Sequence, residues 1–305
     1  MSIASYIQEI GAQNHHLAMR DLRPLSGLAF DQRDEFVRSW GAIVPERRAE
    51  IVRAMVDLAE DNVDLDFSSA LFWMLDDAEV GVRTTAIEGL WEDTSLRLLR
   101  RLLTMLQADP EPDVRAAAAL LLGRFAYLSV TDELPEEDGA ALESTLLQTM
   151  FDKSQSFDVR RRAMEAAGYF SDAEAVQREI EQAYASNEQL LRESALVAMG
   201  RSMQPRWLPT ISAALGAASP ALRYEAARAA GEMADEARSL LPRLVQLAEA
   251  SDSEVALAAI WALGQIGSDA ARRALQRMRK DADETRSQAA EEALEELSLD
   301  QSLLG

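Results

Sequence analysis

Residues 109–125 read DPEPDVRAAAALLLGRF, and this stretch decides the fold because its pattern returns six more times along the 305-residue chain. Here an acidic turn precedes Val114, an arginine follows the valine, and a glycine comes nine positions after it. Successive copies are 30 to 33 residues apart, except for one interval of 45 residues. A period of this length is typical of a solenoid built from repeated helical hairpins.

The seven copies share fixed positions when each is aligned on one apolar or near-apolar anchor residue. The anchors are Val82, Val114, Val159, Leu191, Leu222, Val255 and Thr285. The residue four positions later is alanine in all seven copies, and the residue nine positions later is glycine in five. We expect the alanine where helices approach closely, because a larger side chain would overpack the core. Glycine near the helix end permits either tight packing or a left-handed cap.

Each copy divides into two helical segments. In the copy at 109–125, five apolar residues share one helical face: Val114, Ala118, Leu121, Leu122 and Phe125. An apolar-periodic segment such as SLRLLRRLLTML (95–106) comes before it. Neither helix can bury its stripe alone, whereas stacked pairs bury a continuous core. The sequence therefore predicts an all-α protein: a right-handed α-solenoid of about seven helical hairpins plus an N-terminal helical cap.

The pattern also predicts the organisation of the chain. We expect an N-terminal helical cap region at 1–61, the repeat solenoid at 62–297 and a C-terminal tail at 298–305. Pro45 suits the first turn of a helix in the cap region. The long interval contains an acidic segment at 128–139, which we interpret as a surface loop, either a plain insertion or a docking element.

The repeat resembles the HEAT repeat, specifically the HEAT-like repeat of phycobilisome lyases. The hallmark of that repeat is an acidic turn followed by Val-Arg-x-x-Ala-x-x-x-Leu-Gly, and DPEPDVRAAAALLLG matches it. The resemblance covers about residues 62–297 and implies a helical solenoid. It assigns no single activity, because such repeats are found in scaffolds, adaptors, lyase subunits and a few enzymes.

Composition narrows the functional classes. The formal charge of −21 would repel nucleic-acid phosphates and anionic lipids, so we expect no nucleic-acid and no membrane partner. The N-terminus shows no signal-peptide pattern, and no apolar run approaches the roughly 20 residues of a membrane helix. We therefore predict a cytoplasmic protein. Acidic zones at 54–82 and 281–300 could attract a basic partner or form a solvated face.

Sequence motifs offer no support for catalysis. The chain has no cysteine, and its only histidines are the adjacent pair His15 and His16, which we interpret as a surface pair. Deoxyhypusine hydroxylases, which are HEAT-like enzymes, bind iron through repeated His-Glu pairs, and this sequence contains none. GxSxG, P-loop and HExxH motifs are also missing. We predict no catalytic, cofactor-binding or metal-binding residue and no cofactor; a lyase-type activity stays open as an alternative.

An arginine follows the anchor residue in six of the seven copies. We call these residues the arginine ladder: Arg83, Arg115, Arg160, Arg192, Arg223 and Arg286. A cation in the first helical turn opposes the helix dipole, so its repetition indicates a specific partner. An acidic side chain or a turn carbonyl of an adjacent repeat would supply charge-assisted hydrogen bonds. A phosphate-binding row is the alternative, which the surrounding negative charge disfavours.

A second set of residues suggests a binding surface. Positions two and six after the anchor point away from the buried stripe, and position ten lies at its edge. Many carry charge, such as Glu165, but the C-terminal copies also carry apolar and aromatic residues. We call the candidate set the strip residues: Tyr169, Val197, Arg201, Tyr224, Arg228, Leu257 and Trp261. Tyrosine, tryptophan and arginine are enriched at binding hot spots. The alternative is that these side chains pack against neighbouring helices.

These observations favour a protein–protein interaction scaffold or adaptor that binds a protein or peptide on its concave helical face. The alternative is a lyase-like or chaperone-like subunit that acts on a chromophore-bearing or client protein. Only the lyase-like alternative requires a tetrapyrrole and hence visible absorbance.

Overall fold

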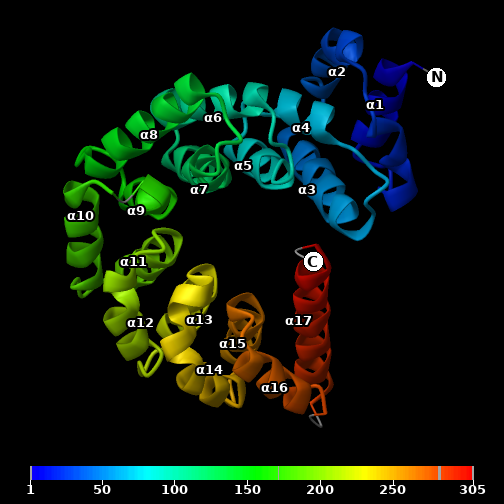
Figure 1. Ribbon diagram of the computed structural model, residues 1–305. Helices are drawn as coiled ribbons and strands as arrows, with labels where there is room; N and C mark the ends of the chain where they lie inside the picture. The colour runs from blue at the N-terminus through cyan, green and yellow to red at the C-terminus, as the bar shows by residue number, and fades with distance from the viewer. Residues whose placement is uncertain (1, 171, 281–282, 304–305) are drawn as a thin grey trace. The chain divides into compact units, whose positions relative to one another are not determined.

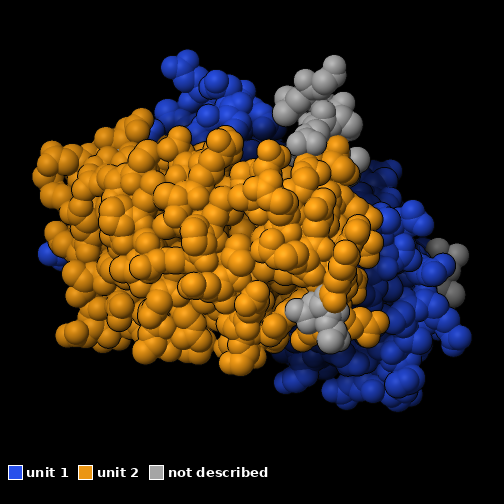
Figure 2. Space-filling model, turned by 60° about the horizontal axis from the view of Figure 1, so that its bottom comes forward, with its two compact units in different colours: residues 1–162 blue, residues 163–305 orange. Residues whose placement is uncertain are grey.

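The computed structural model describes residues 2–170, 172–280 and 283–303. Across these ranges the regular elements are α-helices and short 3-10 helices, and no strand is present. The chain forms two compact units, 1–162 and 163–305 (Figure 2), a division that the repeat pattern does not indicate. No helix in the described part of the chain is both long and apolar enough to cross a membrane.

Unit 1 begins with α1 (Ile3–Gly11), three 3-10 turns, α2 (Arg33–Trp40) and α3 (Pro45–Asp61). Pro45 occupies the first helical position of α3, as expected. The following helices are α4 (Ser68–Met74), α5 (Val80–Gly89), α6 (Leu96–Ala108), α7 (Pro112–Val130) and α8 (Glu136–Phe151). Within this unit α3, α5 and α7 form one layer, against which α4, α6 and α8 pack (Figure 1). The boundary between the units falls inside α9 (Phe157–Ala167).

Unit 2 repeats the two-layer arrangement. One of its layers consists of α11 (Gln189–Arg201), α13 (Pro220–Glu232), α15 (Ser253–Ile266) and α17 (Glu284–Leu303). Its other helices are α10 (Glu174–Tyr184), α12 (Leu208–Ala214), α14 (Leu241–Ala248) and α16 (Asp269–Met278). The 3-10 segments η4 (Gly168–Phe170), η5 (Pro205–Trp207) and η6 (Ala234–Leu240) connect them. α13 contacts α11 and α15, and α15 contacts α17, so the four helices of this first layer lie side by side (Figure 1).

The predicted repeat architecture is confirmed. All seven anchor residues lie in helices that come second in their hairpins, from α5 to α17. The predicted stripe of α7 is buried, with at most 2% of any of its five side chains exposed. Helical periodicity predicted this core because a stripe repeated at 3.6-residue spacing has to be covered.

The repeated glycine allows close helix packing. A Cβ atom on Gly200 would lie 2.7 Å from the Cα atom of Ala229 on α13. Among the described glycines only Gly27 and Gly267 have positive φ. Of the two roles considered for the repeated glycine, the structure therefore shows close packing.

The acidic segment at 128–139 is only in part the surface loop that we expected. α7 continues to Val130 and α8 begins at Glu136, so only residues 131–135 lie outside helices. Acidic residues occupy the first turn of α8, where the helix dipole favours them. Asp138 is buried and pairs with Arg100 of α6, at 2.9 Å from Nε to the carboxylate. The insertion thus lengthens a helical hairpin.

Candidate functional site

Arg83, the first ladder arginine, joins two successive hairpins. Its Nη1 donates to the carbonyl oxygens of Asp77 and Ala78, at 2.8 and 3.0 Å. Its Nε and Nη2 donate to the two carboxylate oxygens of Asp109, both at 3.0 Å. Asp109 follows α6 in the next hairpin, and both side chains of this ion pair are only 8% exposed.

Two further ladder arginines repeat part of this geometry. Each donates from Nη1 to the carbonyls six and five positions earlier, at 2.6 and 3.0 Å for Arg115 and at 2.9 and 3.0 Å for Arg223. Arg115 also donates from Nε to Gln155 Oε1 at 3.1 Å. These carbonyls belong to the turn before the helix, and their negative ends offset the unfavourable position of a cation near a helix N-terminus.

The other three ladder arginines have different partners. Arg160 donates to the Met150 carbonyl, the Arg192 guanidinium lies 5.4 Å from the Tyr184 ring centroid, and Arg286 donates to the Ala250 carbonyl. The repeated sequence position therefore does not impose one repeated contact.

The strip residues all belong to unit 2 and come from consecutive repeats. Tyr169 lies in η4, and the other six are divided equally among α11, α13 and α15. All seven are partly exposed. Because α13 packs between α11 and α15, the structure places their side chains on adjacent helices of one layer.

Two arginine–aromatic pairs organise the strip. The Arg228 guanidinium lies 3.9 Å from the ring centroid of Trp261, and Arg201 lies 5.5 Å from that of Tyr169. These distances suit cation–π attraction. The Trp261 ring also packs against Gly231, where a Cβ atom would lie 2.2 Å from a ring carbon. Trp261 thus contacts the neighbouring helix and still presents part of its surface to solvent.

The structure corrects the prediction that Glu165 points away from the core. It occupies the sixth position after its anchor, which we expected to point away from the core, yet its exposure is 2%. The hydroxyl of Ser194 on α11 donates to its carboxylate, and Arg201 donates to its backbone carbonyl at 3.0 Å. The reason is that α11 packs against η4, which directly follows α9, and thereby covers the side chain of Glu165.

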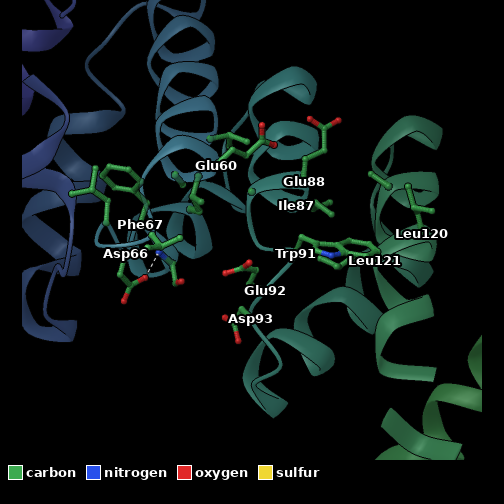
Figure 3. A pocket seen from close by; sticks show the side chains of 18 residues that line it. Glu60, Asp66, Phe67, Ile87, Glu88, Trp91, Glu92, Asp93, Leu120 and Leu121 are labelled. Atoms are coloured by element: carbon green, nitrogen blue, oxygen red, sulfur yellow. Dashed lines mark hydrogen bonds between the residues drawn. The ribbon is translucent and has the colours of Figure 1, made fainter. Parts of the chain in front are cut away.

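Unit 1 contains a cavity of about 590 Å³ that the sequence analysis missed (Figure 3). Its apolar lining includes Val56, Leu71, Ile87 and Leu121, all at most 5% exposed. Five carboxylates also line it: Glu60, Asp66, Glu88, Glu92 and Asp93. We call this site the acidic cavity.

One sequence signal could have indicated the acidic cavity. Trp91 occupies the position nine residues after its anchor, where five other copies have glycine. In this copy Gly89 is the residue that packs closely against α3, since a Cβ atom added to it would lie 2.5 Å from Val56 Cγ2. The Trp91 side chain is free to line the cavity, and it is 48% exposed.

The histidine pair forms part of a local turn contact. His15 Nε2 lies 3.1 Å from the Asp21 carboxylate, while His16 is exposed. In the described ranges no group of three or more histidine, aspartate or glutamate residues is arranged to hold a metal ion.

Two layers of helices with fixed arginine, alanine and glycine positions define a helical-repeat protein. The family model described as HEAT repeats matches residues 208–295, and the model described as HEAT repeat matches residues 98–129. The chain therefore contains HEAT repeats in these two ranges. No curated protein matches it in sequence.

Several solved structures are similar to the chain at low identity. Human deoxyhypusine hydroxylase in complex with glycerol is 18% identical, covers 88% of this chain and 96% of its own, and has a TM-score of 0.39. The complex of CpcE and CpcF of phycocyanin lyase from Nostoc sp. PCC7120 is 22% identical. The match covers 56% of this chain and 99% of the matched one, with a TM-score of 0.38. Importin beta is 14% identical. The match covers 97% of this chain and 46% of importin beta, with a TM-score of 0.46. These likenesses identify no activity for this chain.

Proposed function

We propose that this protein is an interaction scaffold or adaptor that binds a protein or peptide on the surface formed by α11, α13 and α15. The observation that carries the proposal is the partial exposure of Tyr224 and Trp261 on two successive helices of one layer. Stacked repeats present such residues as an extended surface, which is how solenoid proteins hold polypeptide partners.

The packing of Trp261 supports a role in binding, because its side chain is ordered although it is partly exposed. The ring is held between Gly231 and the Arg228 guanidinium before any partner arrives. A side chain that is already ordered loses little conformational entropy on association, so more of its contact energy appears as affinity. Val197 and Leu257 extend the apolar surface along the neighbouring helices.

Site-specific photo-crosslinking tests this surface. A photo-crosslinking amino acid would replace Tyr224 in one protein and, as a matched control, the exposed Gln246 of α14 in another. After irradiation in an extract of the source organism, mass spectrometry should identify a defined protein with the first variant alone. Adding Trp261→Ala should remove that product while the circular dichroism spectrum stays unchanged.

Two results would count against the scaffold function. Identical products from the two positions would show that α11, α13 and α15 form no specific surface. A visible absorption band after incubation with a bilin, combined with no crosslinked protein, would support the lyase-like alternative instead.

A further inference from the structure

We propose that the acidic cavity of unit 1 binds a basic segment of a partner polypeptide, with an apolar side chain inside and lysine or arginine side chains at the rim. The observation that supports this proposal is that an apolar floor, a half-exposed Trp91 and five carboxylates line one cavity (Figure 3). This site is independent of the surface formed by α11, α13 and α15.

The floor of the cavity suits an apolar side chain. Val56 of α3, Ile87 of α5 and Leu121 of α7 contribute to it. Figure 3 shows the Trp91 indole extending toward Leu121. An inserted aliphatic side chain would therefore contact three helices and one aromatic ring, and it would remove apolar surface from water.

The rim carries a charge that its neighbours neutralise only in part. Glu88 pairs with Arg53 at 3.1 Å, whereas no described arginine or lysine forms an ion pair with Glu60 or Glu92. None of the 18 lining residues is basic. The Arg124 guanidinium lies 6.0 Å from the Trp91 ring centroid, and Arg124 itself does not line the cavity. A cationic ligand would complement this field, and an anionic one would be repelled.

The arrangement favours a peptide over other occupants. The carboxylates come from the end of α3, the segment at 62–67, the last turn of α5 and the segment after it, and all five line the same cavity as the apolar floor. A ligand that satisfies them needs positive charges on both sides of an apolar group, which a short basic peptide provides. A second copy of this chain is disfavoured, because its net charge of −21 would repel the rim.

Fluorescence anisotropy with the full chain tests the site. The probe is a fluorescein-labelled peptide with a central leucine between two pairs of arginines. One control peptide replaces the leucine by glycine, and another replaces the arginines by glutamine. We expect saturable binding of the probe and at least about tenfold weaker binding of both controls, since each lacks one of the two recognition elements.

Variants of the chain locate the binding. Glu60→Gln combined with Glu92→Gln should raise the Kd of the probe by about fivefold, because two rim charges are lost. Trp91→Ala should raise it by about tenfold. The matched control, Glu46→Gln combined with Glu111→Gln, removes the same charge from exposed sites of unit 1 outside the cavity and should leave the Kd unchanged. Circular dichroism melts verify that each variant folds.

Three outcomes would overturn the proposal. Equal binding of the leucine and glycine peptides would mean that the apolar floor is not used. An equal loss of affinity in the matched control would indicate general attraction to an acidic surface. Displacement of the probe by spermine at the same concentration as by unlabelled peptide would indicate a site for small polycations.

Discussion

The contacts of Arg83 show how an arginine is stabilised at the start of a helix. The side chain reaches back to the turn carbonyls of Asp77 and Ala78 and forward to the carboxylate of Asp109. The planar guanidinium can make both sets of bonds at once, which a lysine ammonium cannot. Arg115 makes the same backward bonds but has the neutral Gln155 as its forward partner.

This difference predicts unequal mutational effects. Arg83→Ala should lower the free energy of unfolding by about 3–5 kcal/mol, because Asp109 is left as a buried charge without its partner. Arg115→Ala should cost about 1–3 kcal/mol, since only neutral acceptors lose their donor. Denaturant unfolding followed by circular dichroism measures both. Equal losses would show that the ion pair adds nothing beyond the carbonyl bonds.

The Asp138–Arg100 pair predicts a pH effect. The hydrogen bond from Arg100 lowers the pKa of Asp138 below its ordinary value. A lowered folded-state pKa stabilises the fold above the unfolded value of about 3.9, and this contribution is lost as the pH falls through the folded value. The difference in unfolding free energy between the wild type and Asp138→Asn should therefore be constant from about pH 5 to 7 and shrink below about pH 4. A difference that grows on acidification would contradict this sign.

At the scale of elements, glycine determines how closely the second helices of successive hairpins pack. Gly200 of α11 faces the backbone of Ala229 on α13, and Gly231 faces the ring of Trp261 on α15. In the first copy the glycine is shifted to Gly89, and Trp91 then lines the acidic cavity. One displaced small residue thus changes a packing contact into a candidate binding site.

Glycine-to-alanine substitutions test this packing. Gly200→Ala should destabilise the protein by about 1–3 kcal/mol, because the new methyl group would lie 2.7 Å from the Ala229 Cα atom and the helices would have to separate. Gly81→Ala is the matched control, since a Cβ atom added at Gly81 would have no neighbouring atom within 4 Å. This substitution should stabilise the protein by about 0.4–1 kcal/mol. Thermal melts of the two variants should shift in opposite directions. A Gly200→Ala variant with an unchanged melt would show that α11 and α13 separate without cost.

At the scale of the whole molecule, charge restricts the choice of partners. Each unit carries more carboxylates than basic side chains, and the basic residues of the arginine ladder are engaged with carbonyls, carboxylates or rings. Association with a nucleic acid would add repulsion, because carboxylates outnumber the basic side chains that could replace the counterions on its phosphates. Protein segments that are apolar or basic suit the two candidate surfaces better.

This charge predicts that the full chain does not bind duplex DNA at physiological salt. A labelled duplex should show no change in anisotropy up to tens of micromolar protein, in contrast to the basic probe peptide. The same titration at low salt should also be flat, because weaker screening strengthens repulsion. Saturable binding in the micromolar range would contradict the prediction.

The sequence by itself determined the helices, the hairpin repeat and the buried stripe. Those features depend on local periodicity, so Val114 and Phe125 could be assigned to the core from their spacing alone. The tertiary structure decided the burial of Glu165, the different partners of the ladder arginines, the helical form of the segment at 128–139 and the acidic cavity. The burial of Glu165, the arginine partners and the acidic cavity depend on how closely a neighbouring hairpin approaches. That distance is determined by side chains about 30 residues away in the sequence, so the periodicity within a single helix does not predict it.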